Sequence, residues 1–276
     1  MYKTPTVLNR PKSSLQPLWR YLSCERLVDL LTSEELYFTH LPRLSDGLEG
    51  TLTARTHDRL LKWSVERYGN WSLARQEVAT YQKHSAAFFV NCWHMNDAES
   101  YLMWKAYGDR GCAIQTTFER AQIAFDDFPG EVNGGVIQYI DFSRETLPVG
   151  NVFAAVITKD VLYRDEREFR FLYWQPQYGE EFAEPGPPGI RIKVNLNKLI
   201  EKIYVSPKLG NLPPEISKLV SAKRLECSVL ASAVKTTSGS EVAVGTLVAQ
   251  RPPPRSVRAA LPHTAPASGY NDKASE

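Results

Sequence analysis

Hydrophobic positions recur with two different periods along this chain, and together they predict both helices and strands. Leu27, Leu30 and Leu31 fall at helical spacing after Ser23, a residue type that favours a helix N-cap. We also expect a helical insert over 58–81, a helix that begins at Asn96, and a helix over 152–162 before a strand over 163–174. The apolar run 86–93 has the length and composition of a buried strand, and residues 190–196 alternate between apolar and polar as in a strand with one solvated face. Since the helices are placed irregularly between the strands, we expect an α+β fold with a central, mostly antiparallel sheet and helices packed around it.

The composition of the two ends sets the expected domain boundaries. Residues 1–17 are polar and contain three prolines, so we expect an N-terminal extension there. A single α+β domain is expected over residues 18–235. Residues 236–276 are rich in Ser, Gly, Pro and Ala, and so little apolar surface cannot offset an ordering entropy of about 1 to 2 kcal/mol per residue. We therefore expect a disordered C-terminal tail.

Overall composition excludes several classes of protein. The 276 residues carry a formal charge of +2, with 43% hydrophobic and 11% aromatic residues. A fibrous or disordered chain is excluded, and so is a polybasic protein, so nucleic acid is not an expected partner. No apolar run approaches the roughly 18 residues that cross a bilayer, and the N-terminus has no apolar signal core, so we expect a cytoplasmic protein without a membrane partner.

Several common catalytic and metal-binding motifs are missing from the sequence. It contains no GxGxxG, Walker, GxSxG or HExxH pattern, which removes the usual dinucleotide-fold, P-loop, serine-hydrolase and zincin mechanisms. The four cysteines are scattered without CxxC spacing, and the histidines lack metal-site spacing. We expect structural thiols and no resident metal.

The segment 163–174 is the most informative one for chemistry. If it is extended, alternation places Glu166, Glu168 and Arg170 on one face and aromatic rings on the other. Neighbouring carboxylates raise one another's pKa and a guanidinium lowers it, so this face can provide a general base or a clamp for a hydroxyl group. The alternative is a cross-strand ion pair on a solvated face.

Two further segments contain candidate ligand-binding residues. Asp46 and Glu49 lie in a loop with two glycines, where a carboxylate can hold a ribose hydroxyl or a metal, or simply cap its own turn. His94 follows a buried strand and precedes a helix that carries Trp104, so it is placed for ligand contact or proton transfer. A surface His94 and a core Trp104 are the alternatives.

A series of short segments runs in a fixed order through residues 18–205. The segments are Trp19-Arg20-Tyr21, Leu36-Tyr37-Phe38, 44–50, Val90-Asn91-Cys92-Trp93, Met103-Trp104 with Tyr107, 111–114, 136–139 and 166–170. Together they resemble a bacterial family known as domain of unknown function 2971. That family has no established activity, so the resemblance implies a common fold and leaves the chemistry open.

A second resemblance implies a reaction. Arg20 near an early strand, a strand that ends at residues 92–94, and Glu166-x-Glu168 are similar to elements of ADP-ribosyltransferases. The resemblance implies that Glu168 grips the nicotinamide-side ribose of NAD and supports an oxocarbenium-like state, that Glu166 orients the acceptor, and that Arg20 holds a phosphate. The chain departs from that pattern because residues 92–94 are Cys-Trp-His where those enzymes have Ser-Thr-Ser.

We therefore expect an NAD-using, ADP-ribosyltransferase-like enzyme with a small-molecule or nucleotide ligand and a macromolecular acceptor that the sequence does not identify. The expected catalytic residues are Glu168 and Glu166. The expected cofactor-binding residues are Arg20, Tyr21, Asp46, His94, Trp104 and Arg170. Two alternatives remain open: a ligand-binding or interaction module without chemistry, and a magnesium-dependent phosphodiester hydrolase that uses Asp46, Glu49, Glu166 and Glu168 around one ion.

Overall fold

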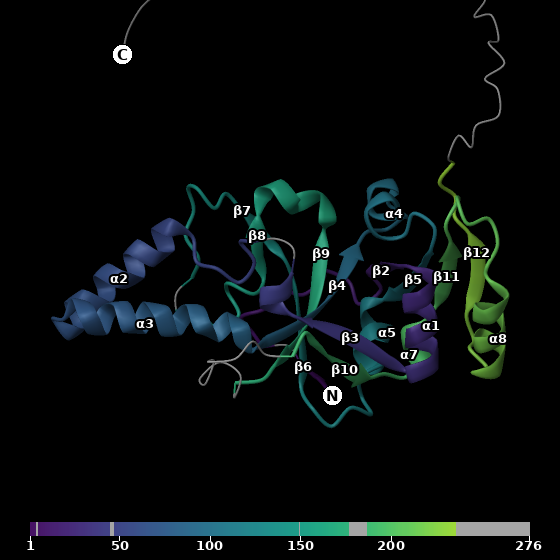
Figure 1. Ribbon diagram of the computed structural model, residues 1–276, viewed down its shortest axis with the longest axis horizontal. Coiled ribbons are helices and arrows are strands. Elements are labelled where there is room, and N and C mark those ends of the chain that lie inside the picture. The colour runs from purple at the N-terminus through teal and green to yellow at the C-terminus, as the bar shows by residue number, and fades with distance from the viewer. Residues whose placement is uncertain (4, 45–46, 149, 177–186, 236–276) are drawn as a thin grey trace, which may run out of the picture. The chain divides into compact units, whose positions relative to one another are not determined.

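A computed structural model describes the chain apart from residues 4, 45–46, 149, 177–186 and 236–276 (Figure 1). The expected disordered tail and the loop residue Asp46 therefore lie outside the described residues. The described residues belong to one compact unit, Met1–Ser238.

A mixed, mostly antiparallel sheet forms the centre of this unit (Figure 1). Its strands run in the order β1-β6-β9-β4-β2-β5-β11-β12, and β3 joins β10 to β4. Together with the surrounding helices, this sheet confirms the predicted α+β class. The strands are β1 Tyr2–Lys3, β2 Pro17–Leu22, β3 Glu35–His40, β4 Phe88–Met95, β5 Cys112–Thr117, β6 Val132–Val136, β9 Glu168–Trp174, β10 Gly189–Lys193, β11 Lys202–Val205 and β12 Ser228–Ala231. A separate parallel pair consists of β7 Gln138–Ile140 and β8 Thr158–Asp160.

The helices begin at residues whose side chains bind free backbone N–H groups. Ser23 caps the first helix by accepting from the Arg26 N–H, as the sequence predicts. Ser100, and not the expected Asn96, caps the helix that carries Trp104. Among the described residues, no helix combines the length and apolar character that a membrane crossing needs. The helices are α1 Cys24–Ser33, α2 Ala54–Tyr68, α3 Trp71–Lys83, α4 Tyr101–Tyr107, α5 Phe118–Ile123, α7 Leu196–Leu199 and α8 Pro214–Ala222.

The central strand β9 separates two apolar cores. Phe169 and Phe171 are fully buried in the larger core, where their rings meet edge to face with centroids 4.9 Å apart. Leu172 packs in the smaller core. Glu168 and Arg170 lie on the same face of the strand as Leu172, because side chains alternate along a strand, and both are buried. The sheet thus carries two charged side chains into its interior.

The segment before β9 differs from the sequence prediction. We expected a helix over 152–162 and a strand from Tyr163, but residues 158–160 form β8 and Val161–Glu166 form the 3₁₀ helix η3. The Asp160 carboxylate caps η3 by accepting from the Leu162 N–H at 2.9 Å. Arg167 has a left-handed backbone with φ of 42° and turns the chain into β9. Glu166 is therefore outside the strand.

Two helices, α2 and α3, form an antiparallel pair that extends away from the sheet (Figure 1). Gly69 ends α2 with a left-handed backbone, φ 60°, and Asn70 begins α3 by accepting from two N–H groups of its first turn. The buried residues Leu60, Ala74 and Val78 lie along the pair, which otherwise exposes most of its surface. This pair is the helical insert that the sequence predicts.

Candidate functional site

A cavity of about 240 Å³ lies where β2, β4, the N-terminal end of β9 and the 3₁₀ helix η3 meet. One part of its wall is aromatic and another is charged. Residues from segments far apart in the sequence share this wall. They include Trp19, Arg20, Tyr21, Arg26, Glu49, Cys92, Trp93, His94, Tyr107, Lys159, Tyr163, Glu166 and Glu168.

Lys159 lies at the centre of the charged part. Its ammonium is 3.0 Å from a Glu49 oxygen, 2.7 Å from Glu166 Oε2 and 3.5 Å from Glu168 Oε2. The side chain is only 5% exposed. Burial works against the charged amine, but the three carboxylates outweigh it and raise the pKa of Lys159. Lys159 therefore stays protonated at neutral pH and holds the three acids together.

Arg170 supports the same cluster from inside the sheet. Its Nε and Nη2 donate to the two oxygens of Glu168 at 2.8 and 3.1 Å, and Nη2 is 2.8 Å from a Glu49 oxygen. Nη1 donates to the Val156 carbonyl at 2.7 Å. Burial alone would raise the pKa of Glu168, but Arg170 and Lys159 hold that pKa below its usual value. Glu168 is therefore ionised, with both oxygens engaged.

The position of the Lys159 ammonium bears on the hydrolase alternative. Glu49, Glu166 and Glu168 do converge, as that alternative requires, but they converge on the amine. In the described part of the chain, no group of three His, Cys, Asp or Glu side chains is placed to hold a metal ion. Asp46, the fourth expected carboxylate, lies outside the described residues.

His94 has one ring nitrogen bonded and the other free. Its Nδ1 is 2.6 Å from the Glu166 carbonyl, which can only accept, so Nδ1 carries the proton and Nε2 has the lone pair. Nε2 is buried without a hydrogen-bond partner among the described residues. Burial lowers the pKa of His94, and the charge of Arg167 adds to this, although the carbonyl opposes it. The cavity wall thus contains a neutral imidazole.

Two arginines lie where this cavity adjoins a second one of about 230 Å³. Arg20 donates from Nη1 to the Asn91 side-chain oxygen at 3.0 Å and to the Cys92 carbonyl at 2.7 Å, both uncharged acceptors. Burial and the nearby charge of Arg26 lower the pKa of Arg20 to about 10, so it remains protonated. Within the described residues, neither Arg20 nor Arg26 is paired with a carboxylate. Their positive charge is available to an anion.

Apart from Asp46, which lies outside the described residues, the expected site residues fall into three groups. Arg20, Tyr21, His94, Glu166 and Glu168 line the cavity together. Arg170 lies behind Glu168 and contacts the site through it. Trp104 is buried behind the wall, where its ring packs edge to face on Tyr21 at 4.9 Å and its Nε1 donates to Glu99 at 2.9 Å.

Sequence reasoning missed Lys159 and Arg26. Lys159 fell in a segment predicted to be a helix, where a single lysine among apolar residues gives no signal of burial between acids. Arg26 is an exposed residue of α1, and only the approach of that helix to β2 brings it to Arg20.

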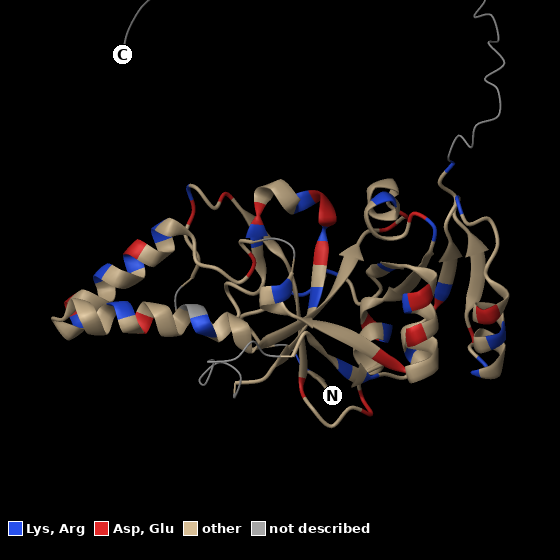
Figure 2. Ribbon diagram, viewed as in Figure 1, with Lys and Arg blue, Asp and Glu red and all other residues tan. Residues whose placement is uncertain are grey.

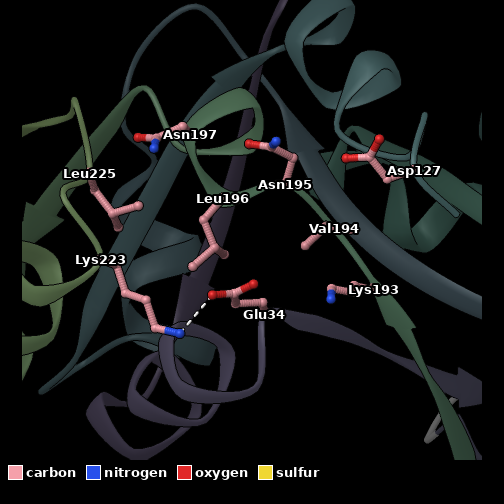
Figure 3. A pocket seen from close by; sticks show the side chains of 9 residues that line it. All are labelled: Glu34, Asp127, Lys193, Val194, Asn195, Leu196, Asn197, Lys223 and Leu225. Carbon is pink, nitrogen blue, oxygen red and sulfur yellow. Dashed lines mark hydrogen bonds and ion pairs between the residues drawn. The ribbon is translucent and has the colours of Figure 1, made fainter.

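Another cavity, of about 180 Å³, contains none of the expected site residues (Figure 3). Glu34 and Lys223 meet across it with an ion pair of 2.6 Å. Asn195 caps α7, and the Asn197 side chain accepts from the Glu226 N–H at 2.9 Å. Four of its polar side chains, those of Glu34, Lys223, Asn195 and Asn197, are therefore committed to local structure, and the cavity beside Lys159 is the stronger candidate.

Comparisons with family models, with curated proteins and with solved structures find no match to this chain. The two resemblances stated from the sequence therefore stay expectations, and the functional argument rests on the cavity.

Proposed function

We propose that the cavity binds a nucleotide and that the protein is an NAD-using, ADP-ribosyltransferase-like enzyme. The observation that carries the proposal is the division of one cavity wall into three chemically different parts. Arg20 and Arg26 provide unpaired positive charge, Trp19 and Tyr21 provide rings, and Glu166 with Glu168 provide anionic charge. A dinucleotide presents phosphates, aromatic bases and ribose hydroxyls, which these three parts complement.

The charged cluster supports a reaction that develops positive charge on a sugar. When the bond between nicotinamide and ribose C1′ breaks, its electron pair leaves with nicotinamide and an oxocarbenium-like ribose remains. An ionised carboxylate near that position stabilises the cation. Lys159 and Arg170 keep Glu168 ionised in a buried position, where water screens its charge poorly.

Glu166 is the carboxylate better placed to contact a hydroxyl group directly. Its Oε2 is held by Lys159, but the only partner of Oε1 within the described residues is the Tyr107 hydroxyl at 3.4 Å. Both oxygens of Glu168 are bound by Arg170. We therefore assign the ribose hydroxyl to Glu166 and the electrostatic role to Glu168, so the ribose contact that the resemblance gives to Glu168 moves to Glu166.

His94 supplies a base for the second half of the reaction. Water or an acceptor hydroxyl forms the new bond to C1′, and its proton passes to the free lone pair of His94 Nε2. The imidazole suits this role because Nδ1 is fixed by the Glu166 carbonyl and the neutral form is favoured.

The test is nicotinamide release from NAD by the full chain, followed by chromatography. Glu168→Gln and Glu166→Gln are expected to lower the rate at least about a hundredfold, within the range typical of lost transition-state stabilisation. Glu131→Gln, which alters an exposed pair with Lys3, is the control and should leave the rate unchanged. An absence of glutamate-dependent release contradicts the enzyme.

One observation favours a ligand-binding module without chemistry as the second candidate. The carboxylate of Glu168 is already satisfied by Arg170 and Lys159, as expected of a structural ion cluster. Calorimetric titration with NAD, AMP and inorganic phosphate separates the two candidates. Binding that requires Arg20 but is not followed by turnover of NAD favours the ligand-binding module. If Arg20→Met loses binding and the exposed control Arg144→Met keeps it, the ligand binds in the cavity beside Arg20.

A further inference from the structure

The far end of the α2–α3 pair exposes four large apolar side chains. Trp63 and Tyr68 belong to the last two turns of α2, and Trp71 and Leu73 to the first turn of α3. The tryptophans are 47% and 56% exposed. We call these four residues the hairpin tip. Exposing several large apolar side chains in one short segment is costly in water and marks an interaction surface.

Positively charged side chains of α2 and α3 lie near the hairpin tip. The Arg67 guanidinium lies over the rings of Trp63 and Tyr68, at 5.2 and 5.3 Å from their centroids. Along α2 and α3, six lysines and arginines stand against three acids, so the pair has a formal charge of +3 while the whole chain has +2 (Figure 2). Glu66 is an exposed acid near the tip. The excess positive charge of the chain is therefore concentrated on these two helices.

We propose that the hairpin tip attaches the protein to an anionic lipid surface. Tryptophan and tyrosine favour the boundary between lipid head groups and acyl chains, and lysine and arginine favour anionic head groups. Trp63 and Tyr68 are five residues apart, about 7.5 Å along a helix axis. This length matches the depth of about 5 to 10 Å to which interfacial helices enter a bilayer.

The geometry favours lipid over single-stranded nucleic acid. A single strand is bound in a groove that follows its backbone, with bases stacked on successive rings. The tip instead lies at the free end of a projecting helix pair (Figure 1). Leu73 also lacks a ring face for stacking but partitions into lipid. A planar surface therefore fits the tip better than a strand does.

This attachment differs from a membrane crossing. The sequence expectation of no membrane partner rested on the absence of a spanning run, and the described helices include none. A hairpin that inserts only its end lies on one leaflet and binds reversibly. The proposal is independent of the chemistry proposed for the cavity.

The test is co-sedimentation of the full chain with vesicles of phosphatidylcholine, with and without phosphatidylserine. Binding is expected only with phosphatidylserine and should weaken with added salt. A double Trp63→Ser, Trp71→Ser variant should lose at least about tenfold in partitioning. A double Lys62→Gln, Arg75→Gln variant should lose about fivefold for each cation removed. The matched control is Tyr101→Ser, since Tyr101 is also exposed and lies beside a cation, Lys105, at 5.8 Å.

Two results overturn the proposal: an absence of binding to phosphatidylserine vesicles, and an equal loss of binding in Tyr101→Ser. If vesicle binding is absent, tip-dependent binding of a fluorescent oligothymidine assigns the tip to nucleic acid, and tip-dependent self-association in sedimentation velocity assigns it to a second copy of the chain. Thermal melts of each variant establish that it is folded, which is expected because the substituted side chains are exposed.

Discussion

Arg170 and Glu168 are next but one along β9, share one face of the strand, and are joined by two parallel hydrogen bonds of 2.8 and 3.1 Å. Both are buried beneath the cavity. A buried pair of this kind is costly to break, because the remaining charge is shielded from water and has lost its closest partner. We therefore expect substitutions in this pair to lower the free energy of unfolding more than substitutions in exposed ion pairs.

Arg170→Met is expected to lower the free energy of unfolding by about 3 to 5 kcal/mol, because Glu49 and Glu168 lose the nearer of the two cations that they share and only Lys159 remains. Urea unfolding measures the change. The control is Arg191→Met, which breaks an exposed pair with Asp29 and should cost less than about 1 kcal/mol. Equal losses in the two variants contradict the buried cluster.

Lys159→Ala is expected to convert the cluster into a weak site for a divalent cation. Glu49, Glu166 and Glu168 would then surround space that the ammonium now fills. The variant should be less stable than the wild type and should regain part of that stability with magnesium or calcium, measured as a rise in melting temperature. Lys159→Arg serves as the control. An equal rise in the melting temperature of the wild type with the same metal contradicts this interpretation.

His94 should make the protein less stable as the pH falls. Its pKa is lowered in the folded state, so below the ordinary value of 6.5 the unfolded chain binds more protons than the folded one. Stability should therefore decrease on acidification from about pH 6.5, by at most about 1.4 kcal/mol per pH unit for this one group. Urea unfolding at pH 7.5 and 5.5 should show a smaller difference in His94→Gln than in the wild type.

Glu168 makes the stability of the fold depend on pH in a lower range than His94 does. Its folded pKa lies below the usual carboxyl value, so its contribution to stability is present above that value and is lost as the pH falls through the folded pKa. The His94 effect therefore begins first on acidification. A His94→Gln protein that loses as much stability as the wild type between pH 7.5 and 5.5 shows that another group is responsible.

Gly111→Ala is expected to destabilise the junction of β2 and β5. An added Cβ would lie 2.0 Å from the Leu22 carbonyl oxygen, so backbone must move, at a cost of about 3 kcal/mol. At Gly47 an added Cβ meets none of the described residues within 4 Å, and Gly47→Ala should change stability by less than about 0.5 kcal/mol. Thermal unfolding of both variants compares them. Similar melting temperatures contradict the close packing at Gly111.

The α+β class and the buried β9 could be predicted because alternation in 168–174 and the apolar run of β4 are local patterns. Glu168 and Arg170 share a face as period two predicts. The position of Glu166 could not be predicted, because the left-handed backbone of Arg167 interrupts the alternation. Arginine is not a residue type that indicates such a turn. Lys159 was missed for a different reason. Its environment is made by Glu49 and β9, which only the tertiary fold brings to it.

The ammonium of Lys159 connects a loop, the small parallel pair and the large sheet at one point. Arg170 and Glu168 pair with each other within β9, but Glu49 reaches a cation only when its loop packs against Lys159 and Arg170, so the cluster is complete only after these long-range contacts have formed. Access to the cavity is thereby tied to the integrity of the whole fold. A chain in which Glu49 is not packed against Lys159 and Arg170 would lack part of the cavity wall, so ligand binding would report that these distant segments have come together.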